Sequence, residues 1–469
     1  MSRTACVILA AGLGTRMKSR LPKVLHPVCG LPMIAHVVRA VGGLRPERTI
    51  MVTGPRGGDI RDAAAAAGLR FAVQKKPRGT GDALRAALPA LEGFRGTVLV
   101  VNGDTPLIDR ATIRAFASRH RRDGNAVSVL SFEARDPSGY GRIVRDASGA
   151  ATAIVEEKDA DAGQKNIREV NSGVYAIDHR ALGLVTGIPL NRAKGEYYLT
   201  DIVAFACRRG LRTAAYNLGH EEDFLGVNTR EELSRASAIM RKRLVRRWTE
   251  RGVQFLAPDT VFIHPDAVIA AEAAIYPNVL IEGASRIGKG AVVYPHVRIS
   301  GSVVGERAVI RDSSVLEGAV VKARASVGPF AHLRPGSVVG PDARIGNFVE
   351  LKKTAVGAGS KASHLSYLGD ARIGRNVNIG AGTITCNYDG RSKHLTVIGD
   401  GVFVGSDTQF VAPVTVGRGA YVGAGSTITK DVPPDALALS RTAQKTLPGW
   451  AAKRRVKPAR RKPDSGKES

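Results

Sequence analysis

Apolar residues along the first 228 positions occur in short runs that alternate with segments of helical spacing. The runs include residues 7–11, 50–53, 97–102, 126–132 and 174–177. Helix-like segments at 59–67, closed by Gly68, and at 111–122 lie between them. Alternation of this kind predicts a mainly parallel sheet covered by helices, an α/β domain. Its ligand site is expected at the carboxyl ends of the strands.

A single helix is predicted to follow this domain. The segment TREE at 229–232 has the form of a capping box, and apolar residues then recur near helical spacing from Leu233 to Trp248. Gly252 marks the end of this segment. We interpret residues 229–252 as a helix that links two domains.

From residue 253 onward, isoleucine or valine recurs every six residues. On an α-helix a six-residue step turns by about 240°, so the marked residues would spread around the whole cylinder. Six is a multiple of the strand period, so the pattern predicts a parallel β-helix of hexapeptide repeats. The marked positions are Ile263, Ile269, Ile275, Ile281, Ile287, Val293 and Ile299; after a slip, Val303, Val309, Val315, Val321, Val327, Leu333, Val339, Ile345 and Leu351; and finally Ile398, Val404, Phe410, Val416, Val422 and Ile428.

The repeat pattern fails in two places. The first lies between Leu351 and Ile373 and contains His364; the second is the segment NYDGRSKH at 387–394. Irregular segments on rigid scaffolds often carry chemistry. A lone histidine is more often a structural residue, so both interpretations of His364 remain open at this point.

The segment LAAGLGTRMKSRLPK at 9–23 follows an apolar run and is typical of a strand that opens onto an anion-binding loop. It fits neither the dinucleotide fingerprint nor the P-loop spacing. Its glycines, Gly12 and Gly14, would let backbone N–H groups approach a phosphate, and Arg16 and Lys23 supply positive charge. The alternative is a tight turn between strand and helix.

Two further residues are candidates for a metal site. Asp104 ends the run TVLVVNGD and therefore stands at the carboxyl edge of the predicted sheet. A carboxylate there suits Mg²⁺, which takes one or two carboxylates plus substrate phosphates. Asn228 could add an oxygen ligand. A turn aspartate and a polar residue at a helix start explain the two positions equally well.

Composition limits the remaining possibilities. No apolar run approaches the length of a membrane helix, and Gly12 interrupts the first run too early for a signal peptide, so we expect a cytoplasmic protein. The four cysteines are scattered and suggest neither a zinc site nor a disulfide framework. The net charge of +27 is partly concentrated in the segment 450–469, which we expect to be a disordered, solvated tail. Trp450 is the one aromatic residue of that tail, which offers no series of rings for base stacking, so a nucleic-acid partner is not favoured.

Taken in order, the motifs resemble one family from about residue 5 to 449. They are LAAGLGTRM, LPKVLH, QKKPRGTGDAL, NGD, GYGRIVR, IVEEKD, EVNSG, GEYYLTD and GVN, followed by LRPG, NFVELKK, SHLSYLGD, NIGAGTITCNYDG and VGSDTQFVAPV. The family is the bacterial bifunctional N-acetylglucosamine-1-phosphate uridyltransferase and glucosamine-1-phosphate acetyltransferase. The resemblance implies a Rossmann-like uridyltransferase domain at 1–228, the linker helix at 229–252, a left-handed β-helix acetyltransferase domain at 253–449 and the tail at 450–469.

For the first domain the resemblance implies transfer of UMP from UTP to N-acetylglucosamine-1-phosphate, which yields UDP-N-acetylglucosamine and pyrophosphate. Arg16 and Lys23 would act in catalysis, and Mg²⁺ would lie on Asp104 and Asn228. Asn102 stands where well-known members have tyrosine. The implied nucleotide-sugar contacts are Leu9, Ala10, Ala11, Gly12, Lys23, Gln74, Gly79, Thr80, Asn102, Gly103, Asp104, Gly141, Glu156, Asn171 and Asn228.

For the second domain the resemblance implies acetylation of glucosamine-1-phosphate by acetyl-CoA, before uridylyl transfer, with His364 as the general base and a homotrimer as the working assembly. The alternative is a sugar-1-phosphate nucleotidyltransferase whose β-helix serves only in assembly. The implied acetyl-acceptor contacts are Arg334, Lys352, Tyr367 and Asn378, and the implied acetyl-CoA contacts are Ala381, Asn387, Tyr388, Ser406, Ala424 and Arg441.

Overall fold

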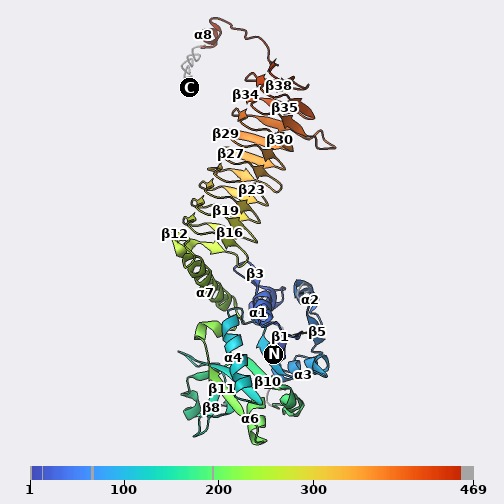
Figure 1. Ribbon diagram of the computed structural model, residues 1–469, viewed down its shortest axis with the longest axis vertical. Helices are drawn as coiled ribbons and strands as arrows, with labels where there is room; N and C mark the ends of the chain where they lie inside the picture. The colour runs from blue at the N-terminus through green and yellow to red at the C-terminus, as the bar shows by residue number, and fades with distance from the viewer. Residues whose placement is uncertain (1–2, 13, 65–67, 193–194, 456–469) are drawn as a thin grey trace, which may run out of the picture. The chain divides into compact units, whose positions relative to one another are not determined.

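The computed structural model describes residues 3–12, 14–64, 68–192 and 195–455 (Figure 1). The chain divides into two compact units, residues 1–318 and residues from 319 onward. The first contains the α/β domain, the linker helix and the first coils of the repeat region. The division falls inside the repeats and therefore does not coincide with the predicted boundaries at residues 228 and 252, which mark changes of sequence pattern.

The α/β domain is built on one sheet with the strand order β11-β7-β10-β6-β1-β4-β5. Strand β10 runs antiparallel to both of its neighbours, β6 and β7, and the other pairs along this path are parallel, which confirms the predicted mainly parallel sheet. The strands are β1 (Thr4–Ala10), β4 (Arg48–Thr53), β5 (Arg70–Val73), β6 (Thr97–Asn102), β7 (Val127–Glu133), β10 (Glu169–Asp178) and β11 (Thr213–Asn217), with β8 (Arg142–Arg145) and β9 (Ala151–Val155) off this path.

Helices cover both faces of this sheet. Alternate residues of β1 point to opposite faces, as the strand period of two requires. Ala5 and Val7 belong to the core beneath α3 (Thr80–Ala87) and α6 (Asp201–Arg208). Cys6 and Ile8 belong to the core beneath α1 (Met33–Gly42), α2 (Gly58–Ala64) and α4 (Arg110–Arg122). The helices predicted at 59–67 and 111–122 are thus present, although residues 65–67 lie outside the described residues.

The linker is helix α7 (Arg230–Thr249), and it begins with the predicted capping box. The Thr229 hydroxyl accepts a hydrogen bond from the Glu232 backbone N–H at 3.2 Å, and the Glu232 carboxylate accepts one from the Thr229 N–H at 2.8 Å. Two of the unpaired N–H groups at the helix start are satisfied in this way. No helix in the described part of the chain combines the length and apolar composition that a membrane span requires.

In the first coils of the β-helix, the inward-facing residues differ from the predicted ones after Ile299. Residues from Ile263 to Ile299 are buried at every sixth position, as expected. After Ile299 the next buried apolar residue is Val304, 1% exposed, whereas Val303 is 38% exposed. The buried series then continues through Ile310 and Leu316, so the predicted positions 303, 309 and 315 are wrong by one residue. A one-residue shift moves a strand residue to the opposite face, and a six-residue spacing alone does not show which of two adjacent valines faces inward.

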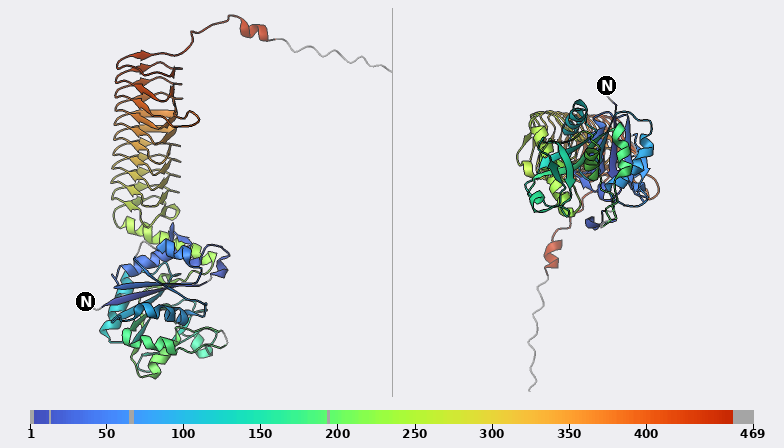
Figure 2. Two further views of the ribbon diagram at one scale, coloured as in Figure 1. Left: turned by 90° about the vertical axis from the view of Figure 1, so that its right-hand side faces the viewer. Right: turned by 90° about the horizontal axis from the view of Figure 1, so that it is seen from below.

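The second unit consists of stacked coils whose strands pair in parallel (Figure 2). The break expected between Leu351 and Ile373 is not an interruption of these coils. Strands β27 (Arg344–Lys352) and β29 (Lys361–Gly369) pair in continuous register, and Val356, Ala362 and Leu368 fill the interior. The six-residue pattern is not evident in the sequence here for two reasons. Alanine replaces the usual branched residue at position 362, and two of the spacings between inward residues are five residues long.

The second predicted departure from the repeat pattern, at residues 387–394, is present in the structure. A loop leaves the coils between β32 (Ile384–Cys386) and β33 (Thr396–Ile398), and Tyr388 forms an antiparallel bridge with Lys393 within it (Figure 2). The described coils end with β39 (Leu437–Ala438). The segment predicted to be a disordered tail begins with a short exposed helix, α8 (Trp450–Arg454), and residues 456–469 lie outside the described residues.

Candidate active sites

A cavity of about 880 Å³ opens at the carboxyl ends of β1 and β6 in the first unit. This is the edge at which parallel sheets bind their ligands. Sequence-predicted residues from five separate segments meet there. They are Leu9, Ala10, Ala11, Gly12, Arg16, Lys23, Gln74, Gly79, Thr80, Asn102, Asp104, Glu156 and Asn228.

The glycine-rich loop forms one wall of this cavity. Gly14 has a left-handed backbone with φ of 63° and precedes the short 3-10 helix η1 (Thr15–Met17). A Cβ added at Gly14 would lie 2.6 Å from the Cβ of Lys23, so this position has no room for a side chain. The turn at Gly14 thus sets how close the loop comes to Lys23. The turn thus brings the loop against Lys23, whose cationic side chain lines the cavity.

The Lys23 ammonium group lies between the two residues proposed as metal ligands. Its Nζ forms an ion pair with Asp104 and donates a hydrogen bond to Asn228 Oδ1 at 3.0 Å. The backbone of Asn228 is fixed by helix α7, since its N–H donates to the Glu232 carboxylate at 2.6 Å. The Val227 N–H donates to the carbonyl oxygen of Asp104 at 2.9 Å. A carboxylate oxygen of Asp104 and an amide oxygen of Asn228, from distant parts of the chain, therefore both contact the Lys23 ammonium group.

Another part of the cavity lining is organised around Glu156. Burial raises the pKa of its carboxyl group above the usual value, and the Thr200 hydroxyl donates a hydrogen bond to it at 3.1 Å. Gln74 donates to the Gly79 carbonyl at 3.0 Å, and the Thr80 hydroxyl accepts from the Leu199 N–H at 3.1 Å. The side chains of Glu156, Gln74 and Thr80 are therefore polar groups held in place by hydrogen bonds. Such groups can form hydrogen bonds with the hydroxyl groups of a ligand.

Three predicted residues lie behind the cavity and do not line it. The Gly103 N–H donates to the Leu9 carbonyl at 2.9 Å, and the Asn171 N–H donates to the Gly141 carbonyl at 2.9 Å. A Cβ at Gly141 would lie 3.6 Å from Glu156 Oε1, so this glycine adjoins the carboxylate. Sequence reasoning missed several lining residues, although five of them lie in the motifs IVEEKD and GEYYLTD. The missed residues are Thr15, Val24, Pro77, Ala83, Gly139, Glu157, Lys158, Asp159, Glu196 and Tyr198.

Asn102, which departs from the family pattern, packs against a glycine. Gly173 has φ of 80°, and a Cβ there would lie 2.3 Å from Asn102 Nδ2. The amide of Asn102 therefore fills the space beside Gly173 at the floor of the cavity. Its side chain is short and polar, so this contact differs from the aromatic one that the family pattern implies.

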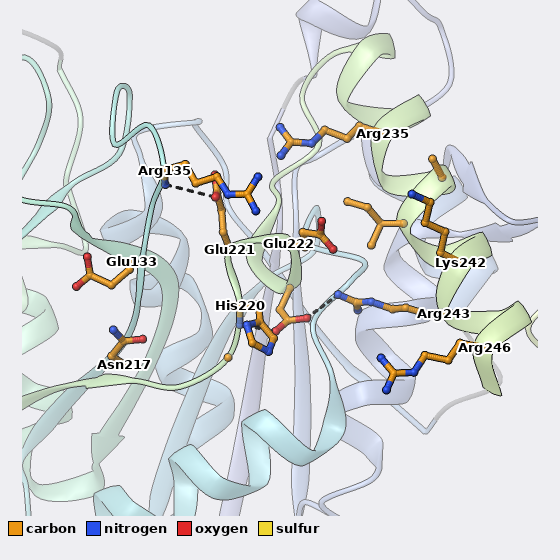
Figure 3. Close-up of a pocket in the computed structure, with 14 residues that line it drawn as sticks. Glu133, Arg135, Asn217, His220, Glu221, Glu222, Arg235, Lys242, Arg243 and Arg246 are labelled. Carbon is orange, nitrogen blue, oxygen red and sulfur yellow. Dashed lines mark hydrogen bonds and ion pairs between the residues drawn. The ribbon is translucent and has the colours of Figure 1, made fainter. Parts of the chain in front are cut away.

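A second cavity in the first unit, of about 840 Å³, lies between β7, the 3-10 helix η6 (Glu221–Phe224) and helix α7. Figure 3 shows basic side chains of α7 facing acidic side chains across this cavity. Arg243 pairs with Asp223 at 2.5 Å, and the Arg135 N–H donates to Glu221 at 3.4 Å. Its acidic and basic side chains are nearly equal in number, and none of the residues predicted from the sequence is among those that line it.

The second unit brings the predicted acetyl-acceptor residues onto adjacent strands. His364 on β29 stands opposite Asn347 on β27, and Tyr367 stands opposite Glu350. His364 is exposed, and its Nδ1 lies 3.1 Å from Asn347 Oδ1. Arg334 donates to the Glu350 carboxylate at 2.9 Å. A basic nitrogen and a guanidinium group therefore stand on the same sheet of the β-helix.

Lys352 lies within a cluster that the inserted loop completes. Its Nζ is 3.6 Å from Asp370 Oδ2, and Asn387 Nδ2 donates to the same carboxylate oxygen. The neighbouring Lys352 ammonium group lowers the pKa of Lys393 on the inserted loop. A Cβ at Gly369 would lie 2.5 Å from the Tyr367 hydroxyl, so this glycine makes room for the tyrosine. Lys393 belongs to the segment 387–394, where the repeat pattern was expected to fail, but it is not among the predicted site residues.

The predicted acetyl-CoA residues form a column along successive coils. The Asp407 N–H donates to the Ala381 carbonyl at 2.7 Å, and the Gly425 N–H donates to the Ser406 carbonyl at 2.8 Å. Arg441 donates to the Ala424 carbonyl at 2.8 Å. Residues 381, 406, 424 and 441 are thus stacked neighbours. Tyr388, 59% exposed, stands on the inserted loop, and Asn378 pairs with Phe403 in register.

Comparisons with known proteins agree with this two-part organisation. Residues 6–174 match the family model described as a MobA-like NTP transferase domain, and residues 395–430 match the bacterial transferase hexapeptide model. A protein of Thermodesulfovibrio yellowstonii named "Bifunctional protein GlmU" is 46% identical over 449 residues, which cover 96% of this chain and 99% of that protein. A protein of the same name from Heliobacterium modesticaldum is 48% identical over 446 residues, 95% of this chain and 97% of that protein. Because the match extends over nearly the whole length of both chains, this chain belongs to the family of bifunctional GlmU proteins, which confirms the resemblance inferred from its motifs.

Proposed function

We propose that the cavity of the first unit transfers UMP from UTP to N-acetylglucosamine-1-phosphate. A phosphate oxygen of the sugar phosphate attacks the α-phosphorus, the bond to the β-phosphate breaks, and pyrophosphate leaves. Such transfer depends on positioning and on neutralising negative charge. Arg16 and Lys23 supply that charge at the triphosphate, and Glu156 accepts hydrogen bonds from sugar hydroxyls. The supporting observation is the convergence of Lys23, Asp104 and Asn228 beside the glycine loop.

The same cluster fits a magnesium ion. Asp104 and Asn228 already direct two oxygen atoms toward one cationic point, and Mg²⁺ commonly takes few protein ligands plus phosphate oxygens and water. When bound, the ion would neutralise charge on the triphosphate. Lys23 would then leave its position between the two oxygens and turn toward the phosphates. Removal of divalent cations with EDTA is expected to abolish uridylyl transfer and leave acetyl transfer unchanged.

We further propose that the second unit acetylates glucosamine-1-phosphate. The amine attacks the thioester carbon of acetyl-CoA, the carbon–sulfur bond breaks, and CoA leaves as the thiol. His364 removes a proton from the amine, a role that contributes roughly 10² to 10⁴-fold. Arg334 and Lys352 hold the sugar phosphate by their charge, and Tyr367 and Asn378 contact the sugar. The column formed by Ala381, Ser406, Ala424 and Arg441, together with Asn387 and Tyr388 of the inserted loop, holds acetyl-CoA.

The exposed position of His364 supports an assembly of several chains, for which the family resemblance implies a homotrimer. A cofactor as long as acetyl-CoA needs walls on more than one side, and a single β-helix offers mainly flat faces. Closed symmetry is usual for homo-oligomers, so we propose that neighbouring chains complete each acetyl site. We also propose a cytoplasmic enzyme in which acetylation precedes uridylyl transfer, with functional domains at 1–228 and 253–449.

A product assay tests the proposal. The chain is incubated with glucosamine-1-phosphate, acetyl-CoA, UTP and Mg²⁺, and UDP-N-acetylglucosamine, pyrophosphate and free CoA are measured. All three are expected. If pyrophosphate forms from supplied N-acetylglucosamine-1-phosphate while CoA is never released from acetyl-CoA, the β-helix serves assembly only and the acetyltransferase proposal is wrong.

A further inference from the structure

The side chain of Asn347 is the hydrogen-bond partner of the His364 ring in the described part of the chain. The two residues stand directly opposite each other on β27 and β29, and Asn347 Oδ1 lies 3.1 Å from His364 Nδ1. Ser366, two residues further along β29, donates to the His364 backbone carbonyl at 2.8 Å and not to its ring. The ring orientation therefore depends on one amide.

The backbone holds this pair at close range. A Cβ added at Gly346 would lie 1.9 Å from the carbonyl oxygen of Ser363, closer than any two such atoms can approach. Glycine at 346 thus allows the strand before Asn347 to lie against the strand before His364. The pairing continues without a shift from Arg344 with Lys361 to Lys352 with Gly369. A rigid ladder, and not a flexible loop, sets the distance between amide and imidazole.

The chemistry of this contact fixes the position of the imidazole proton. An amide oxygen can only accept a hydrogen bond, so the proton of neutral His364 must lie on Nδ1. The lone pair is then on Nε2, the atom that faces away from Asn347. A general base needs a free lone pair within reach of the proton it removes. After Nε2 takes a proton, Nδ1 remains a donor to Asn347, so the same contact holds the ring throughout the reaction.

We propose that Asn347 is a positioning residue for acetyl transfer, which fixes the tautomer and orientation of His364. This inference rests on the proposed role of His364 as the general base. Asn347 itself touches neither substrate in the proposal. It acts through the imidazole alone, so its loss should lower kcat and leave the KM values for acetyl-CoA and glucosamine-1-phosphate nearly unchanged.

Charged groups around the imidazole are few on the adjoining strands. In the next coil, the residues stacked on His364 and its neighbours are Gly380, Ala381 and Gly382, none of which carries a charge. The Gly382 N–H donates to the Leu365 carbonyl at 2.7 Å. The titratable side chains nearest in register are Lys361 and Tyr367 on β29 itself and Arg344, Glu350 and Lys352 on β27. A charged side chain introduced at position 347 would therefore be the charged group in direct contact with the His364 imidazole.

Three variants of the full-length protein test this proposal. Asn347→Ala removes the acceptor, Asn347→Asp keeps an acceptor but adds a negative charge, and Ser363→Ala serves as a matched control on the neighbouring strand position. Acetyl transfer is followed by release of the CoA thiol from about pH 5.5 to 9, a range that brackets an ordinary histidine pKa. Uridylyl transfer, oligomeric state and thermal unfolding are measured on the same samples.

We expect Asn347→Ala to lower kcat by about 10- to 100-fold, less than the full contribution of a general base. Asn347→Asp should retain most of kcat at high pH, and its acid limb should move up by about one pH unit, because the carboxylate stabilises the imidazolium form. Ser363→Ala should match the parent. Full activity of Asn347→Ala, or equal losses in both Asn347 variants without a pH shift, would overturn the positioning role.

His364→Ala separates the failure of this inference from failure of the proposed function. If His364→Ala keeps acetyl transfer, the general-base assignment is wrong and the inference falls with it. If His364→Ala abolishes acetyl transfer while Asn347→Ala behaves as the parent, the base assignment stands and the positioning role alone is refuted. Unchanged oligomeric state and thermal unfolding in every variant verify that the β-helix is intact, and unchanged uridylyl transfer verifies that the first unit is.

Discussion

Replacement of Gly14 by alanine should damage uridylyl transfer through the geometry of the loop. Gly14 has φ of 63°, a conformation that costs a residue with a Cβ about 1–2 kcal/mol. The added Cβ would also lie 2.6 Å from Lys23 Cβ and 3.5 Å from Lys23 Cα, so the loop and Lys23 cannot both keep their places. Because Lys23 contacts both Asp104 and Asn228, any shift reaches the proposed metal ligands.

The expected magnitude has two bounds. The backbone cost alone corresponds to about 5- to 30-fold in the population of the competent loop. Complete loss of the Lys23 contact would resemble removal of one transition-state donor, about 10² to 10³-fold in rate. We therefore expect kcat/KM for uridylyl transfer to fall by about 10- to 10³-fold, with acetyl transfer unchanged because its residues lie in the other unit.

Pyrophosphate release measures the first activity and CoA thiol release the second. Gly58→Ala is the matched control, since a Cβ there meets nothing within 4 Å and its φ lies outside the left-handed range. It should behave as the parent in both assays. A folded Gly14→Ala protein with the uridylyl transfer rate of the Gly58→Ala control would refute the argument. Equal loss of both activities would point instead to general unfolding.

Three more predictions follow from the separation of the two sites. Arg16→Ala should lower uridylyl transfer by about 10² to 10³-fold, as expected for a lost transition-state donor, and leave acetyl transfer unchanged; equal loss of both would refute the two-site arrangement. Trimers mixed from His364→Ala chains and Arg441→Ala chains should regain some acetyl transfer if neighbouring chains share a site, whereas full acetyltransferase activity in a demonstrated monomer would exclude sharing. Truncation before Ala451 should leave both reactions intact, because the last residue of the predicted sites is Arg441; loss of acetyl transfer with an intact fold would show that the segment takes part.

The sequence alone was sufficient for the repeating and local features of this chain. The strand at 97–102 and the capping box at Thr229 were located correctly, since runs of β-branched residues and side chain to backbone hydrogen bonds act over a few neighbouring positions. The six-residue period excluded a helix and predicted the β-helix. The family motifs supplied the candidate residues, and their order supplied both activities.

Tertiary structure decided what depends on contacts between distant segments. The inward residue is Val304 and not Val303, because the choice between adjacent valines depends on how one coil stacks on the next. The coils continue through Ala362, a residue too small to mark the pattern in the sequence. Neither the Lys23 contact with Asp104 and Asn228 nor the pairing of Asn347 with His364 can be read from the chain, since each requires segments that folding alone brings together.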